Sequence, residues 1–184
     1  YIRHTINETK ESIWIAQREG RAKDSNDRTQ GSVLKMLNMS GDKDIVSNIM
    51  DLNIFPVAIS YEYDPCDFLK AKEFQMKRDD PDYVKSQRDD LLNMETGILN
   101  NKGRVHFTLT EPINDQLAAL DRNMEKNELV AAIASIIDRE IYKHYRFYPC
   151  NYVAYDMLTG TKRFSGNYGL RDKKHFEEYL QGQL

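Results

Sequence analysis

The chain has 184 residues, of which 40% are hydrophobic and 30% charged, and its formal net charge is −3. This length suits one domain of ordinary size, and the apolar fraction is sufficient for a core. The net negative charge excludes a general attraction to nucleic acid, so any basic site must be local. No apolar run approaches the ~20 residues that span a bilayer, and no signal-peptide pattern is present. The two cysteines, Cys66 and Cys150, match no metal-binding spacing and indicate no disulfide scaffold, which favours a cytoplasmic setting.

The first residues have the pattern of an amphipathic helix that is already under way. The sequence begins at Tyr1 without a methionine, and residues 1–12 continue this helical pattern. We therefore expect the chain to be a fragment of a longer protein.

Segments with strand-like patterns alternate with helical ones along the chain. Runs rich in β-forming residues predict strands at 12–17, 53–63, 104–112 and 151–158. Apolar residues at helical spacing predict helices at 32–40, 43–52, 66–78, 80–99, 125–145 and 171–181. This alternation predicts an α/β fold with a mixed, largely parallel sheet and helices on both faces.

Two of the predicted strands have informative patterns. The segment 53–63 is almost continuously apolar through Ile59, which is typical of a strand buried on both faces. Pro56 cannot donate a ladder hydrogen bond, so it belongs at a strand start, an edge or a bulge. The segment 104–112 alternates between an apolar face (Val105, Phe107, Leu109) and a wetter face (His106, Thr108, Thr110).

A cluster of charges follows the first predicted strand directly. The loop carries four basic residues beside Gly20, which lets the backbone approach a ligand closely: Arg18, Arg21, Lys23 and Arg28. Ligands of α/β sheets bind beyond the carboxyl ends of the strands, and the N-terminus of the next predicted helix also attracts anions. The loop is therefore a candidate phosphate site. The alternative is a solvated loop whose charges pair with one another and with water.

The order of three sequence blocks resembles the glycerolipid acyltransferases, the family of glycerol-3-phosphate and lysophosphatidate acyltransferases. Glu19-Gly20-Arg21 resembles the third block of this family, and Ile54-Phe55-Pro56-Val57 resembles the fourth. Residues 101–113 look like the strand that follows. The resemblance covers residues 1–115, which it identifies as the C-terminal half of an acyltransferase-like domain. Residues 116–184 are then an extension packed on the same compact unit.

The resemblance implies roles for the residues of the charged loop. Arg18, Glu19, Gly20, Arg21 and Lys23 would hold the phosphate of the acceptor, while Pro56 shapes its strand near the site. One departure concerns the order of residues, because Arg21 follows Gly20 directly where the family has a threonine between them.

A larger departure is the absence of the catalytic block, a histidine and an aspartate separated by four residues. The closest of the four histidines is His106, five residues before Glu111, but residues five apart on a strand point to opposite faces. The family's second block, with its arginine, is not identifiable either. We therefore expect no catalytic residue in this chain, with the general base lying upstream.

The implied reaction moves a fatty acyl group from an acyl thioester, of coenzyme A or acyl carrier protein, to a hydroxyl of a glycerol phosphate or lysophospholipid. No cofactor or metal is expected beyond this thioester substrate, and no nucleic-acid partner. The parent enzyme would be cytoplasmic and peripheral to the membrane, while this fragment alone would be inactive. The alternative is a non-catalytic domain that binds a phosphorylated ligand or a partner protein.

Overall fold

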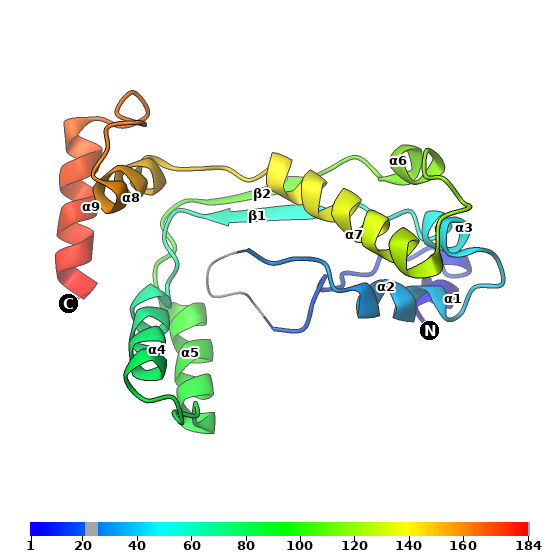
Figure 1. The fold of residues 1–184 in the computed structure, drawn as a ribbon, viewed down its shortest axis with the longest axis horizontal. Helices are drawn as coiled ribbons and strands as arrows, with labels where there is room; N and C mark the ends of the chain where they lie inside the picture. Colours follow the sequence, from blue (N-terminus) through cyan, green and yellow to red (C-terminus); the bar gives the residue numbers. More distant parts are fainter. Residues whose placement is uncertain (21–25, 184) are drawn as a thin grey trace. The chain divides into compact units, whose positions relative to one another are not determined.

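The computed structural model of the chain describes residues 1–20 and 26–183. In this described part, helices dominate, and the only sheet has two strands (Figure 1). The elements in chain order are α1 (Ile2–Asn7), α2 (Gly31–Asn38), α3 (Ile45–Met50), β1 (Val57–Tyr61), α4 (Asp67–Asp79), α5 (Gln87–Leu99), β2 (Val105–Leu109), α6 (Asn114–Ala118), α7 (Lys126–Lys143), α8 (Pro149–Thr159) and α9 (Leu170–Gln183).

The chain divides into two compact units. Unit 1 comprises residues 1–58 and 107–145, and unit 2 comprises residues 59–106 and 146–184. The division between the units falls within β1, within β2 and between residues 145 and 146. The pairing is antiparallel, since Thr110 donates its N–H to the carbonyl of Pro56 and Glu62 donates to that of Arg104.

Unit 1 contains a core built around the long helix α7. The apolar residues of α7 lie at helical spacing on one face and pack against α2, α3 and α6. The fully buried side chains include Leu34, Ile49, Ile113, Leu117 and Ile133. The helix starts at a capping box, in which the Glu128 carboxylate accepts the N–H of Glu125 at 3.3 Å. This core holds α7 as a fixed support for the segments around it.

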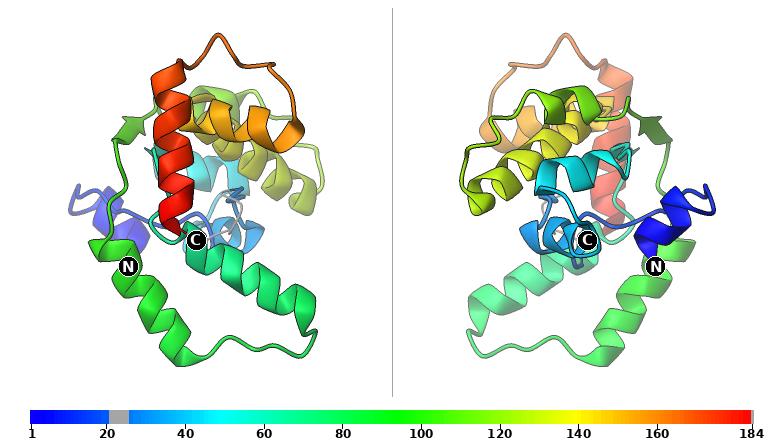
Figure 2. Two further views of the ribbon diagram at one scale, coloured as in Figure 1. Left: turned by 90° about the vertical axis from the view of Figure 1, so that its left-hand side faces the viewer. Right: turned by 90° about the vertical axis from the view of Figure 1, so that its right-hand side faces the viewer.

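Unit 2 contains two pairs of helices. Helices α8 and α9 contact each other, and the loop between them is tied to the buried carboxylate of Asp156. This carboxylate accepts hydrogen bonds from the Phe164 N–H at 3.0 Å, the Tyr168 hydroxyl at 3.0 Å and the Thr161 hydroxyl at 3.1 Å. Helices α4 and α5 are joined by residues 80–86 and diverge from each other (Figure 2). Each of these two helices buries a single residue, Glu73 in α4 and Thr96 in α5.

The predicted α/β fold class is wrong. The described residues contain one two-stranded antiparallel sheet and no parallel sheet with helices on both faces. The predicted strand 12–17 has no regular structure, and its side chains at Trp14 and Ile15 are exposed. A short apolar run does not by itself specify a strand, because a strand needs a neighbour to bond its backbone.

The predicted strand 151–158 is also wrong, because this segment is helix α8. Pro149 occupies the first helical position, where a proline is favourable, and the Asn151 side chain accepts the N–H of Tyr148 at 2.7 Å. Gly160, with φ of +64°, ends the helix in the left-handed conformation. The proline and glycine mark the two ends of this helix more reliably than its aromatic composition does.

Most of the other predicted elements are confirmed. The helices predicted at 32–40, 43–52, 66–78, 125–145 and 171–181 correspond to α2, α3, α4, α7 and α9, and the strands predicted at 53–63 and 104–112 correspond to β1 and β2. Only 87–99 of the predicted helix 80–99 is helical, because Ser86 caps it by accepting the Asp89 N–H at 3.2 Å. The apolar face of β2 is exposed, whereas Thr110 on the wetter face is buried.

Candidate anion-binding site

The charged loop that follows residue 16 is closed at its base. Gln30 donates its N–H to the carbonyl of Gln17 at 2.9 Å, and the Gln17 side chain donates to the carbonyl of Asp27 at 2.7 Å. The Gln30 side chain in turn accepts the N–H of Glu19 at 2.9 Å. Hydrogen bonds therefore join the two ends of the segment 17–30, which we call the 17–30 loop. Residues 21–25 lie outside the described part of the chain.

Two residues of α7 attach the end of this loop to the core of unit 1. The Asp138 Oδ1 atom accepts two hydrogen bonds from Thr29, from its N–H at 2.8 Å and from its hydroxyl at 2.7 Å. The Tyr142 hydroxyl donates to the side-chain oxygen of Asn26 at 2.8 Å. Hydrogen bonds to a carboxylate are stronger than neutral ones. The loop is thus anchored on a rigid helix close to its last charged residue, Arg28.

The residues that the sequence assigned to the acceptor site lie at the base of the loop where they are described. Arg18 forms an ion pair with Asp27, with 3.6 Å between Nη1 and Oδ1, and its Nε donates to the carbonyl of Glu19 at 3.2 Å. Gly20 has φ of +65° and open space around it. Arg21 and Lys23 lie outside the described residues. The expected position beyond a strand end does not hold, because residues 12–17 form no strand.

Pro56, the residue predicted to shape its strand, immediately precedes β1. It is buried, and its carbonyl accepts the Thr110 N–H at 3.0 Å. This position agrees with the expected start of a strand, where the missing N–H of a proline breaks no ladder bond. Pro56 is not among the residues that line the groove described next.

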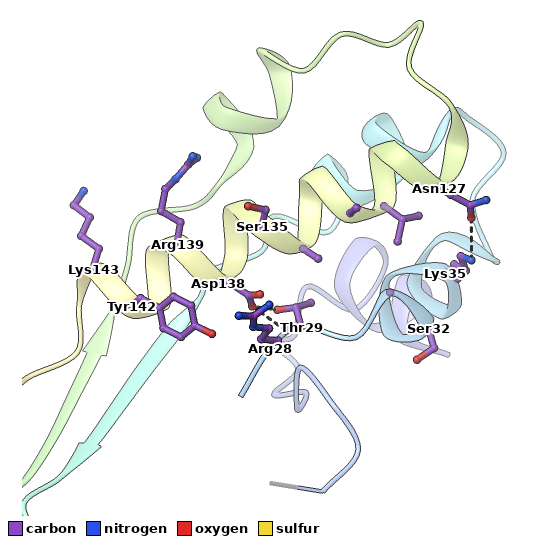
Figure 3. A pocket seen from close by; sticks show the side chains of 14 residues that line it. Arg28, Thr29, Ser32, Lys35, Asn127, Ser135, Asp138, Arg139, Tyr142 and Lys143 are labelled. Carbon is purple, nitrogen blue, oxygen red and sulfur yellow. Dashed lines mark hydrogen bonds between the residues drawn. The ribbon is translucent and has the colours of Figure 1, made fainter. Parts of the chain in front are cut away.

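A groove of about 1010 Å³ runs between α7 and the segment formed by the end of the 17–30 loop and α2, and we call it the α2–α7 groove. Its lining residues are Arg28, Thr29, Gly31, Ser32, Lys35, Asn127, Val130, Ala131, Ala134, Ser135, Asp138, Arg139, Tyr142 and Lys143. Figure 3 shows Arg28 and Thr29 beside Asp138 and Tyr142, whereas Arg139 and Lys143 extend from the other side of α7.

Gly31 allows α2 and α7 to approach closely at this groove. A Cβ atom placed on Gly31 would lie 3.0 Å from the Cγ1 atom of Val130. This distance is tighter than ordinary van der Waals contact, so a side chain at residue 31 would push α2 away from α7. The glycine therefore contributes to the width of the groove.

The lining of the groove is strongly basic. The lining contains four cations and a single carboxylate, which gives it a net charge of +3 in a chain of net charge −3. Within the described part of the chain, Arg28, Arg139 and Lys143 form no hydrogen bond or ion pair, and Lys35 contacts only the neutral side chain of Asn127, at 3.2 Å. The Asp138 carboxylate is already occupied by Thr29. Such an uncompensated local charge attracts anions.

Sequence reasoning identified Arg28 as part of the charged loop but missed the other three cations. Arg139 and Lys143 are four residues apart and so share one face of a predicted helix, which was a usable signal. Nothing in the sequence, however, places α2 and the end of the loop beside α7. The groove depends on contacts such as that between Thr29 and Asp138, which are 109 residues apart.

No protein-family model matches the chain, and neither the curated proteins nor the solved structures contain a significant match. The described residues hold no group of three or more histidine, cysteine, aspartate or glutamate side chains suited to a metal ion. Among them, no helix combines the length and the apolar character required to cross a membrane.

Proposed function

We propose that this chain supplies the acceptor phosphate-binding part of an acyltransferase related to the glycerolipid acyltransferases. The observation that carries the proposal is the basic α2–α7 groove, which begins where the loop with the Glu19-Gly20-Arg21 block ends. Arg28 and Thr29 belong to both the loop and the groove lining. A phosphate at this point would meet the unpaired guanidinium group of Arg28, whose planar set of donors suits phosphate oxygens.

The role of this site in acyl transfer would be binding and orientation. The acceptor hydroxyl attacks the thioester carbonyl, so that a C–O bond forms as the C–S bond breaks. A general base takes the hydroxyl proton, and the departing thiolate receives a proton in turn. The family resemblance implies that this base is supplied by another part of the enzyme. By fixing the phosphate, the groove would hold the hydroxyl at a defined distance from the thioester.

Binding of glycerol 3-phosphate to the chain tests this function. At low ionic strength, the Arg28→Gln variant should bind this ligand about tenfold more weakly, since one charge-assisted contact is lost. Glycerol, which lacks the phosphate, should not bind measurably. Arg171→Gln, on α9 in unit 2, is a matched control and should leave the affinity unchanged. Equal affinities of the Arg28 variant and the wild type would contradict the proposal.

Arg21 offers a separate test of the family resemblance, although it lies outside the described residues. If it has the role of the basic residue in the third block, Arg21→Gln weakens glycerol 3-phosphate binding at least tenfold, and Arg21→Lys recovers part of it. If Arg21→Gln binds glycerol 3-phosphate like the wild type, the groove can still be a phosphate site, but the proposed relation to this family is contradicted.

The second candidate function is a non-catalytic domain that binds a phosphorylated ligand. The basic lining of the α2–α7 groove favours it, because such a lining attracts a phosphorylated ligand whether or not the chain takes part in catalysis. Consumption of an acyl thioester separates the two. The chain alone should show none under either proposal, whereas the acyltransferase proposal requires turnover once the segment with the general base is supplied.

A further inference from the structure

The cations of the α2–α7 groove lie at two positions rather than one. Arg28 lies beside Asp138 and Thr29 at the loop end of the groove, whereas Arg139 and Lys143 project from the other side of α7 (Figure 3). Arg139 and Lys143 are one helical turn apart, about 6 Å along the axis. A single phosphate that contacts Arg28 therefore leaves this second pair of cations without an anion.

Neither member of the second pair forms an ion pair or a hydrogen bond within the described structure. Two like charges at this spacing destabilise a helix slightly. The C-terminus of α7 favours a cation in its last turn, which accounts for Lys143 but not for Arg139 one turn earlier. Of the neighbouring acidic residues of α7, Asp138 is engaged with Thr29, and Glu140 forms no ion pair with either cation in the described structure. Arg139 and Lys143 are thus free to bind an external anion.

The rest of the lining suits a small ligand rather than a polymer. Besides the cations, α7 contributes to the lining the small side chains of Ala131, Ala134 and Ser135, together with the ring of Tyr142. Small-ligand sites commonly combine an apolar floor with a few polar groups, and their volumes extend to about 1000 Å³. The net charge of −3 on the chain opposes a long polyanion such as a nucleic acid.

From this arrangement we propose that the α2–α7 groove binds two phosphate groups at once, one at Arg28 and one at Arg139 and Lys143. The two groups belong either to a single small bisphosphate or to two separate phosphorylated ligands. The first position is shared with the proposed function and rests on it. The second position is independent of the acyl chemistry.

The test follows the side-chain nitrogen signals of arginine and lysine by NMR at low ionic strength. Inorganic phosphate is the first probe, and it should shift the Arg28 signal and the Arg139 and Lys143 signals with separate saturation curves. The double variant Arg139→Gln and Lys143→Gln keeps good helix formers and removes both charges. In this variant, the affinity for phosphate at residues 139 and 143 should fall at least tenfold, while the affinity at Arg28 should be unchanged. Lys126→Gln, on the same helix but outside the groove lining, should change neither.

A second pair of probes distinguishes the two sources of phosphate. If one ligand spans both positions, adenosine 3′,5′-bisphosphate binds at least tenfold more tightly than adenosine monophosphate, with one molecule per chain. If two ligands bind, the affinity for the bisphosphate exceeds that for the monophosphate by less than twofold. Inorganic phosphate then saturates at two molecules per chain. Both results support two positions.

Three results would overturn the proposal: no shift at Arg139 and Lys143, a double variant that binds phosphate like the wild type, or an equal effect of Lys126→Gln. These results leave the proposed function intact, which instead fails if glycerol 3-phosphate does not shift the Arg28 signal. The two failures are therefore separable in one titration series.

Discussion

Asp44 shows how one carboxylate can begin a helix and bind a second segment. It accepts the N–H of Ser47 at 3.0 Å and the Ser47 hydroxyl at 2.6 Å, and Arg122 donates to it at 2.9 Å. The hydrogen bonds from Ser47 are the main reason that its pKa lies below the usual 3.8, and the charge of Arg122 adds to the effect. The ionised form is therefore favoured in the folded chain.

We predict that Asp44→Ala lowers the free energy of unfolding by about 1 kcal/mol at neutral pH, the usual cost of losing an N-cap. A lowered pKa contributes stability that is present above pH 3.8 and is lost as the pH falls through the folded value. The difference between variant and wild type should therefore shrink in acid. Urea unfolding at several pH values measures it, with the exposed Asp42→Ala as control. A difference that is constant with pH would contradict this account.

Cys150 is a buried thiol rather than a reactive one. Its Sγ atom donates to the carbonyl of Glu62 at 3.2 Å, and burial, more than the nearby Glu62 charge, raises its pKa from 9.0 to about 11. The thiolate is the nucleophilic form, so little of it is present at pH 8. The stability that this shift contributes is full below pH 9.0 and is lost as the pH rises toward 11.

We expect iodoacetamide to modify Cys150 in the folded chain at pH 8 at least a hundredfold more slowly than in urea, because burial limits access to the thiol and its raised pKa lowers the amount of thiolate. Mass spectrometry of the peptide that contains Cys150 measures this, and the urea-unfolded chain is the reference. Equal rates in the two states would mean that the thiol is accessible in the native structure.

At the scale of elements, the contact between Thr29 and Asp138 is the main attachment of the 17–30 loop to α7. We predict that Asp138→Ala speeds amide exchange at residues 26–30 and lowers the free energy of unfolding by about 1.5–3 kcal/mol, as for a lost hydrogen bond to a charge. Ser135→Ala is the control, because Ser135 lies one turn earlier on α7 without this contact. Unchanged exchange at residues 26–30 would show that the contacts of Gln17, Gln30 and Tyr142 order the loop without Asp138.

The elements that the sequence predicted well are those whose pattern is long and periodic. Helix α7 buries apolar residues at helical spacing over 18 residues, so its periodicity leaves no alternative. The short segments 12–17 and 151–158 were misread, since a few apolar or aromatic residues suit a strand, a helix or an irregular segment equally. In the second case the decisive signals were local, Pro149 before the segment and Gly160 after it.

The groove could not be predicted in the same way. The charged loop is visible in the sequence, and Arg28 belongs to it. The opposite wall comes from α7, more than 100 residues later, and periodicity says which face of α7 is buried but not what lies beside its exposed edge. Pairing of distant elements is set by the packing of the whole core. The same reason applies to β2. Its alternating pattern distinguishes two faces but does not identify the neighbours that decide which face is buried.

At the scale of the whole molecule, the two units differ in the apolar surface they bury. The hydrophobic core cluster lies in unit 1 and includes Leu34, Ile49 and Ile133. The buried hydrophobic residues of unit 2 are Cys66, Tyr148, Cys150 and Val153. Its helix α5 leaves Leu91, Met94, Ile98 and Leu99 more than 60% exposed. Because burial of apolar surface is the main source of stability, the units should differ in local stability.

We predict that amide exchange is slowest in α7 and α3 and fastest, among the helices of eight or more residues, in α4 and α5. The α4 and α5 amides lack a packed apolar face, so their helical hydrogen bonds open without first breaking a core. Limited trypsin digestion should accordingly cut first within residues 67–99, where exposed sites such as Arg78 and Arg88 lie. The Arg78→Gln and Arg88→Gln variants should delay this cleavage without changing exchange in α7. If the amides of α4 and α5 were as well protected from exchange as those of α7, the exposed apolar residues of these two helices would have to be covered in solution.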